Sequence, residues 1–96
     1  MADPELQAEA FGRRFGQNMA RLREAAGLTQ DELSYLAGLH RTEISKLERG
    51  LHVPRADTVV KLCGCLDAGL DELLEGLVWT PPPQPKRGSF AVDESR

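Results

Sequence analysis

The sequence predicts an all-α fold, and three observations support this prediction. Apolar residues recur at spacings of three and four along most of the chain, as they do on the buried side of a helix. Glycine, proline and capping residues separate these stretches at helix-sized intervals. Of the 96 residues, 41% are hydrophobic but only 5% are aromatic, which fits a small helical core better than a β-sandwich. This length allows one domain, which we expect to span residues 9–79.

The first helix is predicted by an apolar stripe whose members lie four, four and three residues apart. The stripe consists of Phe11, Phe15, Met19 and Leu22. Gly27 is the expected end of this helix, because glycine tolerates the left-handed conformation found there. Residues 1–8 are expected to form a flexible N-terminal arm.

Two short helices joined at Gly38 are predicted between residues 28 and 50. Thr29 can accept from the amide of Glu32 while the Glu32 carboxylate reaches back to the amide of Thr29, which is a capping box. The second of the two helices begins after His40, a weaker cap than Ser, Thr, Asp or Asn. Together they are typical of a helix-turn-helix that reads DNA.

The second helix of this pair carries hydrogen-bond donors on the surface that its apolar residues leave free. Arg41 can form a bidentate pair with guanine, Thr42 can bond a base edge or touch a thymine methyl, and Lys46 lies about one turn further on. Ser45 and Glu43 flank this surface. Glu43 can accept from a cytosine amino group or repel the wrong sequences, and the sequence leaves both possibilities open.

Contacts to phosphates are expected from Gln30, at the start of the helix that crosses the DNA backbone. A fourth helix is predicted from Val59, Val60, Leu62, Cys63 and Leu66, and a fifth from Leu70, Leu73, Leu74 and Leu77. Residues 80–96 are expected to be a proline-rich, flexible C-terminal tail, because Thr80 to Pro85 contains four prolines. This tail is either a solvated end or a site for a protein partner.

These motifs resemble the Cro and phage-repressor type of helix-turn-helix regulator, also called the xenobiotic response element (XRE) family. The resemblance covers residues 11–77 and rests on residues 21–30, 37–39 and 44–50, Pro54, Thr58 and residues 70–73. It implies a compact five-helix bundle that contacts DNA through the positions of Gln30, Arg41, Thr42 and Lys46. It also places Arg49, His52 and Arg55 around a loop near the DNA backbone, and it implies a partly buried ion pair between Arg23 and Glu48.

The charge of the chain and its remaining motifs limit the other possibilities. A net charge of −3 gives no overall attraction to phosphate, although residues 40–55 are locally basic. Cys63 and Cys65 point apart on a helix, and neither they nor the two histidines form a ligand set, so we expect no metal and no cofactor. No catalytic motif is present, so we expect no enzyme. No apolar run reaches about 20 residues, so we expect a cytoplasmic protein and no membrane contact.

The function predicted from the sequence is a transcriptional regulator, more readily a repressor than an activator, that binds double-stranded DNA. The resemblance implies a homodimer on an inverted-repeat operator. An apolar patch of Leu74, Leu77, Val78 and Trp79 can serve that dimer or simply close the core. The alternative is a protein-interaction module, such as an antitoxin or anti-activator, that uses the bundle and the tail.

Overall fold

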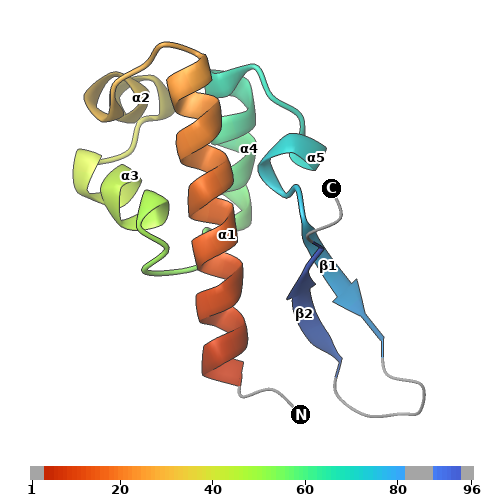
Figure 1. Cartoon of the computed structure of the whole chain (residues 1–96). Helices are drawn as coiled ribbons and strands as arrows, with labels where there is room; N and C mark the ends of the chain where they lie inside the picture. The colour runs from red at the N-terminus through yellow and green to blue at the C-terminus, as the bar shows by residue number, and fades with distance from the viewer. Residues whose placement is uncertain (1–3, 82–87, 94–96) are drawn as a thin grey trace.

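The computed structural model describes residues 4–81 and 88–93. Within them lie five helices: α1 (Pro4–Ala25), α2 (Gln30–Ala37), α3 (Arg41–Glu48), α4 (Ala56–Leu66) and α5 (Leu70–Leu73). The long α1 runs through the middle of the molecule, with α2 and α3 on one side of it (Figure 1). Two strands, β1 (Leu77–Thr80) and β2 (Ser89–Val92), lie on the other side. The predicted helices are present, and a small sheet is added to them.

The predicted ends of α2 are confirmed. The Thr29 hydroxyl accepts from the Glu32 amide at 3.0 Å, and the Thr29 amide donates to the Glu32 carboxylate at 2.9 Å, which completes the capping box. Gly38 ends the helix in the left-handed conformation, with φ of 66°. His40 precedes α3 without a side-chain hydrogen bond to it, as a weak cap should.

The core lies where the five helices meet. Its buried apolar side chains are Phe15, Met19, Leu33, Ile44, Leu47, Leu62, Leu66 and Leu73. Every helix contributes at least one of them, so each helix is held by the others. Most of the residues predicted from helical spacing therefore lie in the core or against it.

Three apolar residues differ from the prediction that they form the buried sides of the fourth and fifth helices. Val60 is 65% exposed on α4 and Leu70 is 53% exposed at the start of α5. α5 is a single turn, and Leu77 belongs to β1 instead of to this helix. A stripe on a short helix is narrower than its apolar residues suggest, because only one side of the turn meets the core.

The prediction of an all-α fold with a disordered tail from residue 80 is wrong for residues 89–92. They form β2 and pair with β1 in antiparallel register, with Val78 opposite Ala91 and Trp79 opposite Phe90. Trp79 and Phe90 meet edge to face with ring centroids 5.0 Å apart, and Phe90 meets Phe11 of α1 at 5.1 Å. An isolated two-stranded hairpin is only marginally stable in water, and these aromatic contacts with α1 and between the strands stabilise it.

The N-terminal boundary also differs from the prediction. α1 begins at Pro4, so residues 4–8 are helical and do not form an arm. Proline is favoured in the first turn of a helix because its missing amide has no helical partner there. The predictions for residues 1–3, 82–87 and 94–96 lie outside the described residues.

Candidate nucleic-acid interface

The α2–α3 pair is fixed by its turn and by its buried side chains. The Leu39 amide donates to the Ser34 carbonyl at 3.0 Å, which closes the turn after Gly38. Leu33 of α2 and both Ile44 and Leu47 of α3 are fully buried. Because these residues anchor one side of each helix, the opposite side of α3 is left facing solvent.

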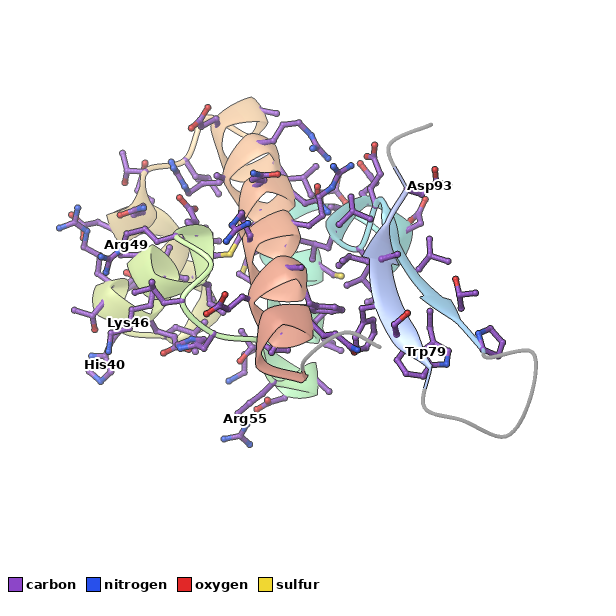
Figure 2. All side chains as sticks on the ribbon, turned by 60° about the horizontal axis from the view of Figure 1, so that its bottom comes forward. His40, Lys46, Arg49, Arg55, Trp79 and Asp93 are labelled. Carbon is purple, nitrogen blue, oxygen red and sulfur yellow. The ribbon has the colours of Figure 1, made fainter. Side chains whose placement is uncertain are left out.

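The solvent side of α3 carries the residues predicted to read bases. Arg41, Thr42 and Lys46 are exposed, whereas Glu43 and Ser45 are half-buried at the edges. Arg49, at the end of α3, is exposed, and its Nε donates to the Ser45 carbonyl at 3.4 Å. Lys46 and Arg49 project away from α1, on the side opposite Trp79 (Figure 2). Arginine can donate two parallel hydrogen bonds, and lysine and threonine can donate single ones. Both kinds of donor match the acceptors on base edges in a major groove.

Behind this surface, Glu48 joins three elements of the domain. Arg23 of α1 donates to both Glu48 carboxylate oxygens, at 2.6 and 3.0 Å, and to the Leu28 carbonyl at 2.8 Å. The Glu48 side chain is 7% exposed and the Arg23 side chain 14%. The hydrogen bond to Glu48 raises the pKa of the Arg23 guanidinium, so Arg23 stays charged. The structure thus brings together the two residues predicted to pair.

Gln30 also takes part in this contact. Its side-chain amide donates to the Glu48 carboxylate at 3.0 Å, which holds Gln30 at the start of α2. An amide NH₂ has two hydrogens, so a second donor remains for a phosphate. The sequence motif gave no sign that Gln30 and Glu48 touch, because they are 18 residues apart.

Two of the predicted DNA-contacting residues, both arginines, form ion pairs at the surface. Arg41 lies 3.4 Å from Asp31 of α2, and both side chains are more than 60% exposed. Arg55 lies 3.3 Å from Asp57, again at the surface. Exposed pairs of this kind contribute little stability and exchange readily for phosphate or base contacts. Both arginines therefore remain available to DNA.

Glu43 is held more firmly. Its carboxylate is 3.0 Å from Nε2 of His52, and both side chains are 39% exposed. His52 lies in the loop between α3 and α4, so this contact connects the loop to α3.

The approach of α1 to α3 depends on glycines that sequence reasoning missed. A Cβ at Gly16 would collide with the Leu47 carbonyl oxygen and would come within 2.7 Å of that of Glu48. A Cβ at Gly12 would lie 3.1 Å from the Gly50 carbonyl oxygen. Their spacing of four residues, which puts both glycines on one side of α1, was the available signal.

Asn18 is a third residue that could not be assigned from the sequence. It is fully buried, and its amide donates to the carbonyls of Leu73 and Glu75, both at 2.9 Å. Asn18 therefore fixes the chain between α5 and β1 against α1. A polar residue inside the apolar stripe, three residues after Phe15, was the available signal.

Other kinds of site find no support within the described residues. No cluster of three or more metal-binding side chains occurs there, and Cys63 and Cys65 are both free thiols. Burial raises the pKa of the Cys63 thiol, which makes it a poor nucleophile. None of the helices in residues 4–81 is both long and apolar enough to cross a bilayer.

Comparisons with known proteins agree on one family. Residues 14–76 match the family model for a helix-turn-helix domain. An uncharacterised HTH-type transcriptional regulator, y4dJ of Sinorhizobium fredii, is 38% identical over 66 residues, which cover 69% of this chain and 86% of the relative.

Two solved structures resemble the chain with substantial sequence identity. The restriction-modification controller protein C.AhdI of Aeromonas hydrophila is 38% identical, with a TM-score of 0.64 over 67% of this chain and 97% of the controller. SinR, described as the master regulator for biofilm formation and solved in complex with DNA, is 29% identical. Its TM-score is 0.61 over 64% of this chain and 98% of the SinR chain in that structure.

Two helices joined by a tight turn, the second with an exposed donor-rich side, define a DNA-binding domain of the helix-turn-helix class. The matches over most of the chain are consistent with this class. The chain belongs to the helix-turn-helix family of transcriptional regulators, whose members bind DNA and are not enzymes.

Proposed function

We propose that this chain binds double-stranded DNA in a sequence-specific manner as a homodimer and represses transcription from an inverted-repeat operator. Each α3 would enter the major groove of one half-site, and the half-sites would lie about 34–36 Å apart, one helical turn of DNA. Repression requires only that the bound protein occupy the promoter. The proposal also implies a location in the cytoplasm, with the DNA.

The exposed side of α3 is the observation that carries this proposal. Arg41, Thr42 and Lys46 are the exposed side chains among the predicted base-contacting residues. We assign base contacts to these three and a flanking role to Glu43 and Ser45. The phosphate contacts are assigned to Gln30, Arg49, His52 and Arg55, which surround α3 on the start of α2 and on the loop that follows. SinR, to which this chain is similar, was solved in complex with DNA, and this similarity supports DNA binding by this chain.

The test is selection of a random double-stranded oligonucleotide library on the protein, followed by binding measurements with variants. Arg41→Ala and Lys46→Ala should each weaken binding to the selected sequence by about 1–3 kcal/mol and relax specificity at one position. Lys61→Ala is the matched control, because Lys61 is an exposed lysine on α4, outside the proposed contacts. Equal losses in all three variants, or no enriched sequence at low salt, would count against the proposal.

A second candidate function, a protein-interaction module, is favoured by one surface. Leu36 and Val60 are 54% and 65% exposed and line a depression of about 440 Å³ between α2 and α4, together with Ala37 and Cys65. Tyr35, beside it, is 87% exposed. Contiguous apolar surface of this kind often marks a protein contact. A Leu36→Lys variant that keeps operator binding but loses regulation in cells would support this function, whereas unchanged regulation would argue against it.

A further inference from the structure

The loop between α3 and α4 places a histidine against a carboxylate of α3. Nε2 of His52 lies 3.0 Å from a carboxylate oxygen of Glu43, and both side chains are 39% exposed. An ionised carboxylate can only accept hydrogen bonds, so Nε2 is the nitrogen that donates. The contact therefore decides which ring nitrogen of an uncharged His52 carries the hydrogen.

The backbone on both sides of His52 is fixed. Gly50 follows α3 in the left-handed conformation, with φ of 72°, and the Leu51 amide donates to the Lys46 carbonyl at 3.0 Å. A Cβ at Gly12 of α1 would lie 3.2 Å from the His52 carbonyl oxygen, so the loop lies against α1 (Figure 1). The His52 ring is therefore held beside α3 by a backbone that packs on α1.

The second ring nitrogen of His52, Nδ1, reaches solvent. It has no hydrogen-bond partner among the described residues, where every buried side-chain nitrogen or oxygen has one. An uncharged ring with its hydrogen on Nε2 has only a lone pair on Nδ1 and cannot donate to a phosphate from there. Only the charged ring, with a hydrogen on each nitrogen, can donate to Glu43 and to a phosphate at once.

Glu43 supplies the negative charge that favours this charged ring. Other charged side chains lie on the elements around the loop, namely Glu9, Arg13 and Arg23 of α1, Lys46, Glu48 and Arg49 on α3 and at its end, and Arg55 and Asp57 at the start of α4. Two of these carboxylates are already paired, Glu48 with Arg23 and Asp57 with Arg55. Positive neighbours oppose a charged imidazole and a carboxylate in contact with it favours one, so Glu43 offsets the basic residues around the loop.

We propose that Glu43 is a positioning residue for His52, which it orients and favours in the charged form, so that Nδ1 donates to a DNA phosphate and binding takes up a proton. This inference rests on the proposed function, which assigns a phosphate contact to His52. Glu43 then supports that contact and neither reads cytosine nor repels wrong sequences. Because uptake requires an uncharged His52 in the free protein, affinity rises as the pH falls from about 8 towards 6.

The first test measures affinity for the selected operator between about pH 6 and 8, at constant salt, by fluorescence anisotropy. Wild-type affinity should rise on acidification by at most about tenfold per pH unit, the limit for one proton. His52→Gln should remove this dependence, whereas His40→Gln, the matched control at the other histidine, should keep it. A wild type without pH dependence, or a His52→Gln variant that retains it, would overturn the proposal.

Glu43→Gln distinguishes support of His52 from repulsion of phosphate. Glutamine can still accept from Nε2 but carries no charge. If Glu43 favours the charged ring, this variant binds more weakly at about pH 7, and its pH dependence moves to lower pH. Stronger binding of the variant at every pH would show that Glu43 only repels phosphate and would overturn the proposal. Absence of operator binding in wild type at every pH would instead refute the proposed function, and this inference with it.

The second test uses the unmodified protein, so that misfolding of a variant cannot obscure the answer. Uncharged methylphosphonate linkages replace the operator phosphates one at a time. At one position the substitution should lower affinity and abolish the pH dependence together, and His52→Gln should be insensitive to the same substitution. At a phosphate bound by Arg49, affinity should fall while the pH dependence stays. A pH dependence that survives every substitution would overturn the proposal.

Discussion

At the scale of single residues, Glu48 is the side chain on which the position of the recognition helix depends most. It accepts from Arg23 of α1 and from Gln30 of α2, and its own side chain is almost fully buried in α3. One carboxylate therefore connects the framework helix, the helix proposed to cross the DNA backbone and the helix proposed to read bases. A polar contact of this kind specifies orientation more than it adds stability.

Removal of one partner of this pair should be strongly destabilising. Arg23→Ala leaves the Glu48 carboxylate buried without its main partner, and we expect a loss of about 3–5 kcal/mol in the free energy of unfolding. Replacing both residues by apolar ones, as in Arg23→Met with Glu48→Leu, should cost much less than the sum of the single changes. Urea unfolding of wild type, Arg23→Met, Glu48→Leu and the double variant gives a double-mutant cycle. A coupling energy near zero would contradict the assignment of a buried ion pair.

The capping box predicts a specific dependence of stability on pH. Hydrogen bonds donated by the Thr29 amide and by the Thr29 hydroxyl lower the pKa of Glu32 from its ordinary value of 4.5. A carboxyl group with a lowered folded-state pKa contributes stability that is present above its unfolded value and is lost as the pH falls through its folded value. The loss attributable to Glu32 should therefore begin below about pH 5.

Glu32→Gln is the matched variant, because glutamine can keep the capping hydrogen bond but does not titrate. The advantage of wild type over Glu32→Gln, measured by urea unfolding at several pH values, should be largest near neutral pH and should shrink on acidification. An advantage that stays constant down to about pH 3 would show that the cap does not depend on the charge of Glu32.

At the scale of helices and strands, α1 is the element that organises the domain. Its glycines allow close contact with α3, and Phe11 contacts Phe90 of β2. Asn18 and Arg14 hold the segment that leads from α5 into β1. The helices of the DNA-binding pair are only eight residues each, too short to be stable alone in water. Their stability depends on packing against this longer helix.

The tight contact between α1 and α3 can be tested with two glycine-to-alanine substitutions. Alanine favours a helix over glycine by about 1 kcal/mol, so Gly64→Ala, with nothing within 4 Å of the new Cβ, should be neutral or stabilising. Gly16→Ala gains the same preference but forces α1 away from the Leu47 and Glu48 carbonyls, and a net loss of about 1–3 kcal/mol is expected. Thermal or urea unfolding measures the free energy of unfolding of both variants. Equal changes in Gly16→Ala and Gly64→Ala would show that the distance between α1 and α3 is not constrained by Gly16.

At the scale of the whole molecule, the distribution of charge matters more than its total. The chain carries a net charge of −3, which opposes DNA over long distances, yet three exposed basic side chains lie on α3 and at its end, namely Arg41, Lys46 and Arg49. Binding should therefore depend on local phosphate contacts and weaken steeply with salt. The protein should discriminate well between its operator and random DNA, because its net negative charge weakens non-specific binding.

The salt dependence of operator binding provides a quantitative test of the phosphate contacts. Plots of log affinity against log salt concentration should be linear with negative slope, and Arg49→Ala should reduce the steepness by about 1, the contribution of one phosphate. Lys61→Ala should leave the slope unchanged. An Arg49→Ala slope equal to that of wild type would remove Arg49 from the set of phosphate contacts.

Much of the helical fold could be predicted because its signals are local. The capping box at Thr29, the glycine at 38 and the apolar stripes each act within a few residues, so the sequence states them directly. The hairpin could not be predicted in this way. Residues 77–80 and 89–92 contain strand-favouring side chains, but they become strands by pairing with each other across an intervening segment and through the contact of Phe90 with Phe11. Neither of these long-range contacts is visible within either segment.

The sequence by itself determined the helix-turn-helix, because its turn, caps and buried positions follow from local backbone preferences and helical spacing. It also determined which donors lie on the exposed side of α3. Only the tertiary structure decided that Gln30 meets Glu48, that His52 meets Glu43 and that Asn18 holds the start of the hairpin. These contacts join residues 9 to 55 positions apart, so no local backbone preference specifies them. They form because burial of the shared core brings the elements together.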